Sequence, residues 1–283
     1  MPDWVTSGRA ETPETVAFLS GAALAHLHLV VRRDDVPQGL LRQRLALRAA
    51  EACVMRAGRS ERAGELRDAV GFLQPGDHPG PAGEVTLSWR RAVERPVSVK
   101  ALHRALNGAL PTLAPEQIAI LLDAGQGGPV ARTATVLETV LAENPCDEAA
   151  ALILAEAVLV QALGWNHIVP LLAVGLKRGD LRKRGEDLRL ACHRAVIASA
   201  AEVIPLAADL ARRAARLNAV APKLRAKGAG AALELFLNRD AVAPSAFTSL
   251  NSDRASRRFC DRLVELGVVR ELTGRDTFRL YGL

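Results

Sequence analysis

Aromatic residues are scarce in this sequence, because phenylalanine, tryptophan and tyrosine together make up only 4% of its 283 residues. Hydrophobic residues as a group still reach 49% and charged residues 24%, which is typical of a globular protein with an ordinary core. Alanine, leucine and arginine dominate the composition. All three are strong helix formers, so the composition favours a mostly helical protein.

Cysteine is also rare, and its spacing excludes the usual zinc sites and disulfide frameworks. The four cysteines lie far apart, at Cys53, Cys146, Cys192 and Cys260, and form no CxxC pair. Isolated cysteines of this kind are typical of reduced, mostly buried thiols in a cytoplasmic protein.

The sequence predicts neither a secretion signal nor a membrane span. Its N-terminus lacks a basic stretch followed by an apolar run. The most apolar region, residues 149–163, is interrupted by Glu156 and Gln161, whereas a span needs about 20 mostly apolar residues. We therefore expect residues 149–163 to form a buried core helix in a cytoplasmic protein without membrane contact.

Motifs for catalysis and cofactor binding are missing as well. The glycine-rich stretches GQGG and KGAGA lack the GK[ST] ending of a phosphate-binding loop. Cys192 and His193 are sequence neighbours that point to different faces of a helix. Glu156 could be a carboxyl group with a raised pKa in a pocket, but a carboxylate at the helix edge or paired with an arginine is the favoured interpretation. We expect no enzyme, no catalytic residue, no metal site and no cofactor.

What the sequence does contain is helical periodicity, separated by turn residues. Asp147 and Ser98 are predicted N-caps, and Pro205 is expected to kink or break the long helix that contains it. The proline- and glycine-rich residues 74–83 are predicted to form a loop. The predicted helices cover about residues 12–31, 40–57, 60–73, a segment through 87–93, 99–109, 115–124, 130–142, 148–163, 171–176 and 188–217.

The last 61 residues predict a different arrangement from the rest. Short helices at about 231–237 and 244–247 precede a third helix, capped by Asn251 or Ser252, that runs to Glu265 or Leu266. Alternating strands at 268–272 and 277–281 then flank a hairpin loop at 273–276. We therefore predict a mostly α protein with a multi-helix, bundle-like body at 1–222. A C-terminal winged helix-turn-helix, three short helices plus a β-hairpin, follows at 223–283.

Positive charge is concentrated near this C-terminal unit. The formal net charge is +6, and residues 210–233 hold six bases and no acid. Such a distribution permits nucleic-acid binding, although a solvated helix face is an equally common explanation.

The third helix places arginines opposite its apolar stripe. In a helix-turn-helix, the start of the second helix enters the major groove, where arginines pair with phosphates or guanine. A self-paired solvent face is the alternative, because Asp253 and Asp261 lie four residues from Arg257. The residues expected to contact DNA are Ser252, Arg254, Ser256, Arg257, Arg258, Arg262 and, at the wing tip, Arg275.

Several stretches carry a family resemblance. The run DRASRRFCDRLVELGVVRELTGRDTFRLYGL, with LRQRLALRAAEACVMRAGR, PGDHPGPAG and LVQALGW, resembles the bacterial family known as domain of unknown function 1403. The likeness covers about residues 17–283. A similar tail occurs in other plasmid- and mobile-element-associated bacterial proteins, where it resembles a DNA-binding helix-turn-helix. The resemblance supports the expected fold and implies no activity, cofactor or catalytic residue.

Together these observations predict a cytoplasmic bacterial protein that contacts double-stranded DNA through its winged helix. It would act as a regulator or as an accessory factor of a plasmid or mobile element, and the helical body would supply homodimer or partner contacts. The alternative is a helical scaffold whose winged helix binds protein instead of DNA.

Overall fold

The computed structural model describes residues 1–7, 12–74, 76–107, 113–224 and 226–283. This described part is mostly helical, as the composition predicts, and contains a single two-stranded sheet. The body (residues 1–222) contains α1 Asp3–Ser7, α2 Pro13–Val30, α3 Gln38–Arg56, α4 Ala63–Gly71, α5 Gly80–Glu94, α6 Val99–Leu106, α7 Pro115–Asp123, α8 Pro129–Glu143, α9 Glu148–Ala162, α10 Leu172–Gly175, the 3₁₀ turn η1 Asp180–Arg182, and α11 Gly185–Val220. After the turn η2 Ala221–Lys223, the C-terminal unit (residues 223–283) contains α12 Ala229–Asn238, η3 Pro244–Ala246, α13 Asp253–Glu265, β1 Arg270–Glu271 and β2 Tyr281–Gly282.

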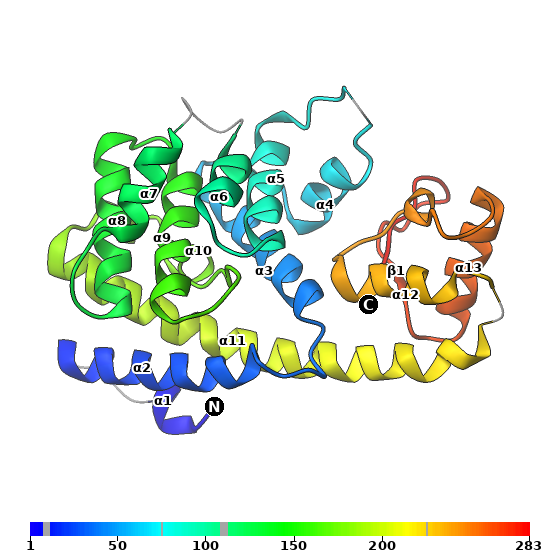
Figure 1. Ribbon diagram of the computed structural model, residues 1–283, viewed down its shortest axis with the longest axis horizontal. Helices are drawn as coiled ribbons and strands as arrows, with labels where there is room; N and C mark the ends of the chain where they lie inside the picture. The colour runs from blue at the N-terminus through cyan, green and yellow to red at the C-terminus, as the bar shows by residue number, and fades with distance from the viewer. Residues whose placement is uncertain (8–11, 75, 108–112, 225) are drawn as a thin grey trace.

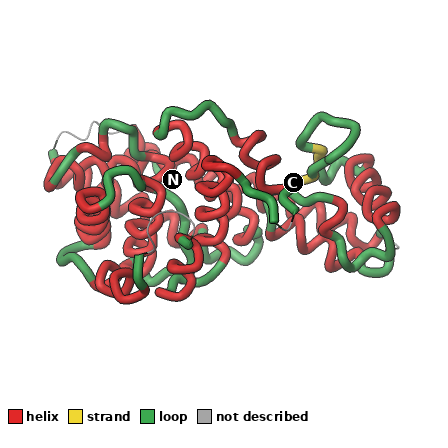
Figure 2. The backbone as a smooth tube through the Cα atoms, turned by 90° about the horizontal axis from the view of Figure 1, so that it is seen from above, coloured by secondary structure: helices red, strands yellow, loops and turns green. Residues whose placement is uncertain are grey.

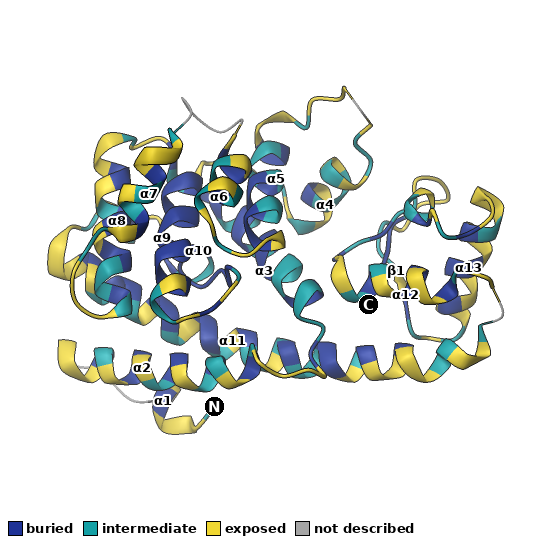
Figure 3. Ribbon diagram, viewed as in Figure 1, coloured by how far each residue is buried: buried dark blue, intermediate teal, exposed yellow. Residues whose placement is uncertain are grey.

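Helix α9 is the centre of the body. Every residue from Ala149 to Val160 is buried, so this helix is apolar on all sides, as expected of a core helix. Helices α3, α5, α7, α8 and α10 pack around it. Figure 3 shows α9 as a dark blue element enclosed by helices whose outer faces are exposed. The burial of α9 confirms the expected core helix at residues 149–163, whose last turn is less covered.

Most helix starts lie where capping residues predict them. The Thr12, Ser98, Asp147 and Ser252 side chains each accept a hydrogen bond from the backbone N–H three residues later. The helix predicted at 60–73 begins later, at Ala63, so Ser60 does not cap it; the Glu65 carboxylate accepts from the Arg62 N–H at 2.8 Å instead. The predicted loop at 74–83 ends early, and part of α6 predicted at 108–109 lies outside the described residues.

Helix α11 joins the two parts of the molecule. It continues unbroken through Pro205, although a break or kink was expected there. Pro205 lies on the exposed side of the helix, where water can satisfy the carbonyl that loses its N–H partner. In Figure 1 this helix runs beneath the body and on to the C-terminal unit. By length and composition alone Gly185–Lys223 could cross a membrane, but here α11 packs against α2, α8 and α10.

The C-terminal unit has its own small aromatic core. Phe247 lies between Phe236 and Phe259, with ring centroids 5.6 Å and 5.9 Å away. The two paired strands are shorter than predicted, and Val242 adds an isolated bridge to Tyr281. Phe278 lies in the strand predicted at 277–281, two residues before buried Leu280, but it is 72% exposed and has a positive φ of 54°, outside the β region.

Polar contacts join the C-terminal unit to the body. The Asp240 carboxylate forms ion pairs with Arg44 of α3 and Arg67 of α4, at 2.7 Å for Arg67. Arg44 also donates to the Leu283 carbonyl at 2.8 Å, so the last residue is buried where the two parts meet. Figure 2 shows the C-terminal unit as a separate lobe at one end of an elongated molecule.

Candidate nucleic-acid interface

The outer face of α13 carries the arginines that the sequence singles out. Arg254, Arg257, Arg258 and Arg262 are all exposed, while Phe259 and Leu263 on the opposite face are buried. Figure 1 places α13 at the end of the molecule, with α12 between it and most of the body. The body therefore leaves this face open to solvent (Figure 3).

Two of these arginines are paired with acids on their own helix. Arg257 lies 3.3 Å from Asp253, and Arg262 lies 3.0 Å from Glu265. All four side chains are mostly exposed, and pairs of this kind contribute only about 0.2–1 kcal/mol. Neither pair therefore prevents an arginine from turning to a phosphate.

The other two arginines, Arg254 and Arg258, can contact a ligand without first breaking an ion pair to a described residue. The guanidinium groups of Arg254 and Arg258 have no ion-pair or hydrogen-bond partner among the residues that the structure describes. They lie four residues apart, so both point to the same side of α13 near its N-terminus. This is the part of a recognition helix that approaches bases and phosphates in helix-turn-helix proteins.

The two serines of the expected site differ in their roles. Ser252 is exposed and caps α13, because its hydroxyl accepts from the Ala255 N–H at 3.2 Å. Ser256 is 2% exposed, and its hydroxyl donates to the Ser252 carbonyl at 3.2 Å. A small side chain whose hydroxyl is satisfied locally can be buried, so Ser256 belongs to the inner face and cannot reach a ligand on the outer one.

The predicted wing tip lies against the body. Arg275 forms an ion pair with Asp68 of α4, and its guanidinium lies 5.6 Å from the centre of the Phe72 ring. The Phe278 ring meets the same Phe72 ring edge-on at 5.8 Å. Arg279, farther along the loop, lies 4.0 Å from Asp261 of α13. The loop after β1 therefore covers the space between α4 and α13, and Arg275 is less free than the arginines of α13.

A second basic surface lies between α11 and the end of α13. Arg212, Arg213, Arg216 and Arg270 line a small cleft of about 140 Å³ together with Asp209. Asp209 pairs with Arg212 at 3.1 Å and with Arg213 at 2.6 Å. No partner of Arg216 or Arg270 occurs in the described ranges, so this cleft has an excess of positive charge. The bases of 210–233 are evident in the sequence, but no sequence pattern places Arg270 beside them.

The buried carboxyl group of the body has a structural role. Glu156 is fully buried, and its Oε1 accepts from the N–H groups of Leu171 and Leu172 at 2.6 Å and of Ala173 at 3.2 Å. Burial raises the pKa of Glu156 to about 8, although these hydrogen bonds oppose the rise. The favoured interpretation, an edge or arginine-paired carboxylate, is therefore wrong. Glu156 holds the start of α10, and Arg56 donates to the Ala173 carbonyl near its end.

The described cysteines and histidines do not gather into a metal-binding cluster. Cys53, Cys192 and Cys260 are buried and Cys146 is exposed. Burial raises the pKa of Cys192 and of Cys260 to about 12, which keeps both thiols protonated and unreactive. Within the described residues, no three histidine, cysteine or carboxylate side chains lie close enough to share a metal ion.

Comparison with known families places the whole chain. A family model described as "Protein of unknown function (DUF1403)" matches residues 1–283. The chain belongs to this family. No curated protein matches the chain. The family description names no activity and no ligand.

Proposed function

We propose that this member of the DUF1403 family binds double-stranded DNA through the outer face of α13. The observation that carries the proposal is the pair of exposed arginines at the start of that helix, Arg254 and Arg258, whose side chains have no partner among the described residues. Arg257 and Arg262 extend the same face and can exchange weak ion pairs for phosphate contacts.

The order of elements supports a winged helix-turn-helix in the C-terminal unit. A helix, α12, is followed by the Val242 bridge, the short turn η3, the capped helix α13 and the β1–β2 pair. Winged helix domains have a similar order, with a full helix where this chain has the three-residue turn η3, and with the helix that corresponds to α13 as the recognition helix. In this arrangement Ser252 positions the start of α13, and its own hydroxyl is used as the cap.

The cleft between α11 and the end of α13 would act as a second phosphate contact. Arg216 and Arg270 lie beside the C-terminal end of α13, and Asp209 is the one acidic side chain among the described residues that line the cleft with the four arginines. A duplex that crosses the outer face of α13 would extend past one end of this helix. Phosphate contacts of this type fix orientation and add affinity without reading sequence.

The test is a titration of fluorescent mixed-sequence duplex DNA at several salt concentrations, followed by anisotropy. We expect wild-type affinity to fall steeply with salt, and Arg254→Ala/Arg258→Ala to bind at least about tenfold more weakly. Loss of two phosphate contacts should also reduce the steepness of the salt dependence by about 1.8.

A matched control removes the same charge elsewhere. Arg178 and Arg182 lie in the exposed turn before α11, and their side chains have no partner in the part of the chain that the structure describes. Arg178→Ala/Arg182→Ala should leave both affinity and salt dependence unchanged. Equal weakening by the two double variants, or no binding by the wild type, would reject the α13 face.

A protein-binding role is the second candidate, and exposed Phe278 favours it. Phe278 is 72% exposed in the loop between the strands, and Val264 of α13 is 38% exposed. Apolar side chains on this unit suit a protein partner better than a phosphate backbone. Absence of DNA binding by the folded wild type would favour this role.

A further inference from the structure

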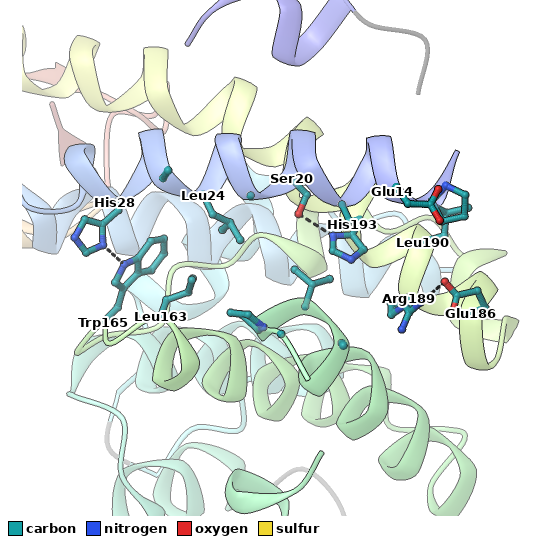
Figure 4. Close-up of a pocket in the computed structure, with 18 residues that line it drawn as sticks. Glu14, Ser20, Leu24, His28, Leu163, Trp165, Glu186, Arg189, Leu190 and His193 are labelled. Atoms are coloured by element: carbon teal, nitrogen blue, oxygen red, sulfur yellow. Dashed lines mark hydrogen bonds and ion pairs between the residues drawn. The ribbon is translucent and has the colours of Figure 1, made fainter. Parts of the chain in front are cut away.

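An apolar pocket lies in the body, far along α11 from the arginine surfaces. It has a volume of about 760 Å³ and lies between α2, α11, the start of α8 and the end of α9 (Figure 4). Sites for small molecules typically measure about 300–1,000 Å³ and are mostly apolar. The apolar side chains that line it include Ala17, Leu24, Ala25, Val130, Leu163 and Leu190.

Hydrogen bonds to side chains of α2 orient the rings of Trp165 and His193 in this pocket. Trp165 Nε1 donates to His28 Nδ1 at 2.9 Å, and His193 Nδ1 lies 2.8 Å from Ser20 Oγ. Figure 4 shows both pairs, with the His193–Ser20 pair in the middle of the pocket. No partner for the Nε2 atom of either histidine is found among the described residues. These two atoms are the hydrogen-bonding positions left for a ligand.

Among the described residues, the charged side chains that line the pocket are Glu14, Glu186 and Arg189, and all three are exposed. Arg189 is paired with Glu186, and the exposed Glu14 lies at the same end of the pocket (Figure 4). Burial, and to a smaller extent Arg189, lower the pKa of His193, which favours its neutral form. An ionised group placed beside His193 would lose its hydration without meeting an unpaired counter-charge.

We propose that this pocket binds an uncharged, mostly apolar small molecule whose single hydrogen-bonding group faces His193. The aliphatic wall formed by Leu24, Leu163 and Leu190 covers the rest of such a molecule. Neutral chemistry separates this ligand from organic acids and amines of the same size. This inference is independent of DNA binding, because none of its residues lies in the C-terminal unit.

Two dyes that differ by one charged group test the ligand class. N-phenyl-1-naphthylamine is uncharged and has one N–H group, and 8-anilinonaphthalene-1-sulfonate has the same ring system with a sulfonate added. We expect saturable fluorescence enhancement with the neutral dye and at least about tenfold weaker binding of the sulfonate. Equal affinity for both dyes would overturn the assignment of a neutral ligand.

Gly21→Leu tests the location. A Cβ atom at Gly21 would meet nothing within 4 Å, so the new side chain can occupy the pocket without displacing its wall. Leucine also favours the helical backbone of α2 over glycine. We expect this variant to bind the neutral dye at least about tenfold more weakly, because the added side chain takes up the apolar volume.

The control is Gly64→Leu in α4, where a Cβ atom is equally unobstructed and the pocket is distant. It should bind the neutral dye as the wild type does. Thermal melting of both variants checks the fold, and if Gly21→Leu melts early, Ala25→Leu on the same wall replaces it. The proposal is overturned if the wild type shows no saturable binding of the neutral dye, or if the pocket-filling variant binds it undiminished.

Discussion

The body and the C-terminal unit use burial in opposite ways. Helix α9 is covered on all sides from Ala149 to Val160, and the carboxyl group of Glu156 within this stretch is buried among backbone N–H groups. Helix α13 buries one face against Phe247 and leaves the other, with its arginines, in solvent. An enclosed helix has no surface for a partner, whereas α13 is stabilised from one side only. The comparison explains why the candidate interface lies on the smaller part.

The largest expected effect comes from the aromatic core of the C-terminal unit. Phe236 is fully buried against Phe247, and Phe236→Ala should lower the free energy of unfolding of this unit by about 3–5 kcal/mol. Hydrogen exchange should then show faster exchange at the amides of α12 and α13, while α9 keeps its protection.

Phe18→Ala is the matched control, because Phe18 is 65% exposed on α2. It should change the unfolding free energy by less than about 0.5 kcal/mol. If Phe236→Ala accelerates exchange in α9 as much as in α13, the two parts unfold as one cooperative unit and the contrast between them is wrong.

The second prediction concerns pH and the body. Burial raises the pKa of Glu156 to about 8 in the folded protein, against an ordinary value of 4.5. Below pH 4.5 the carboxyl group is protonated in both states, so it adds no pH dependence. Between these values the unfolded chain releases a proton that the folded protein keeps, and the free energy of unfolding falls as pH rises. The loss between pH 5 and pH 7 should be on the order of 3 kcal/mol.

Urea unfolding at pH 5, 6, 7 and 8 measures this loss, with Glu156→Gln as the control. The amide oxygen of glutamine can still accept from the Leu171 and Leu172 N–H groups, and glutamine does not ionise. The variant should therefore lack the part of the pH dependence that Glu156 causes. Identical pH profiles for the two proteins would contradict a raised pKa at this position.

The third prediction concerns the contact between the two parts. Asp240 pairs with Arg44 and Arg67, whose side chains are 21% and 19% exposed, so removing its charge leaves two largely buried cations uncompensated. Fully buried pairs lose about 3–5 kcal/mol when one partner is removed, and the partial exposure here reduces the expected loss to about 2 kcal/mol.

Asp240→Asn should lower the melting temperature and increase proteolysis of the C-terminal unit. Asp253→Asn is the control, because it removes an equally sized charge from the mostly exposed pair with Arg257. A melting temperature that falls equally in both variants would show that the contact at Asp240 contributes no more than a surface pair.

Local features of this structure were predictable from sequence, because the interactions that fix them span few residues. The N-caps at Thr12, Ser98, Asp147 and Ser252 each bond to a backbone N–H three positions later. The burial of α9 also followed from its composition, since an apolar helix needs partners on all sides.

The remaining features depend on segments that are distant in sequence. The partners of Glu156 begin 15 residues away, and Arg275 meets Asp68 across 207 residues. Nothing in the pattern near either residue specifies such contacts. Ser256 was misplaced for a different reason, because a polar residue beside an apolar stripe was expected on the outer face. The Ser252 carbonyl satisfies its hydroxyl inside the fold.

The smallest expected effect concerns the loop that lies against the body. The ion pair of Arg275 with Asp68 is partly exposed, so its loss should change stability by less than about 1 kcal/mol. If DNA lies along α13, however, Asp68 competes with phosphate for Arg275. Asp68→Asn should then strengthen duplex binding about two- to fivefold and increase its salt dependence by about one phosphate contact. Asp123→Asn removes the same charge from the exposed end of α7 and should have no such effect. Equal affinity of the wild type and Asp68→Asn would show that Arg275 does not reach DNA, and that α13 and the α11 cleft bind without the loop.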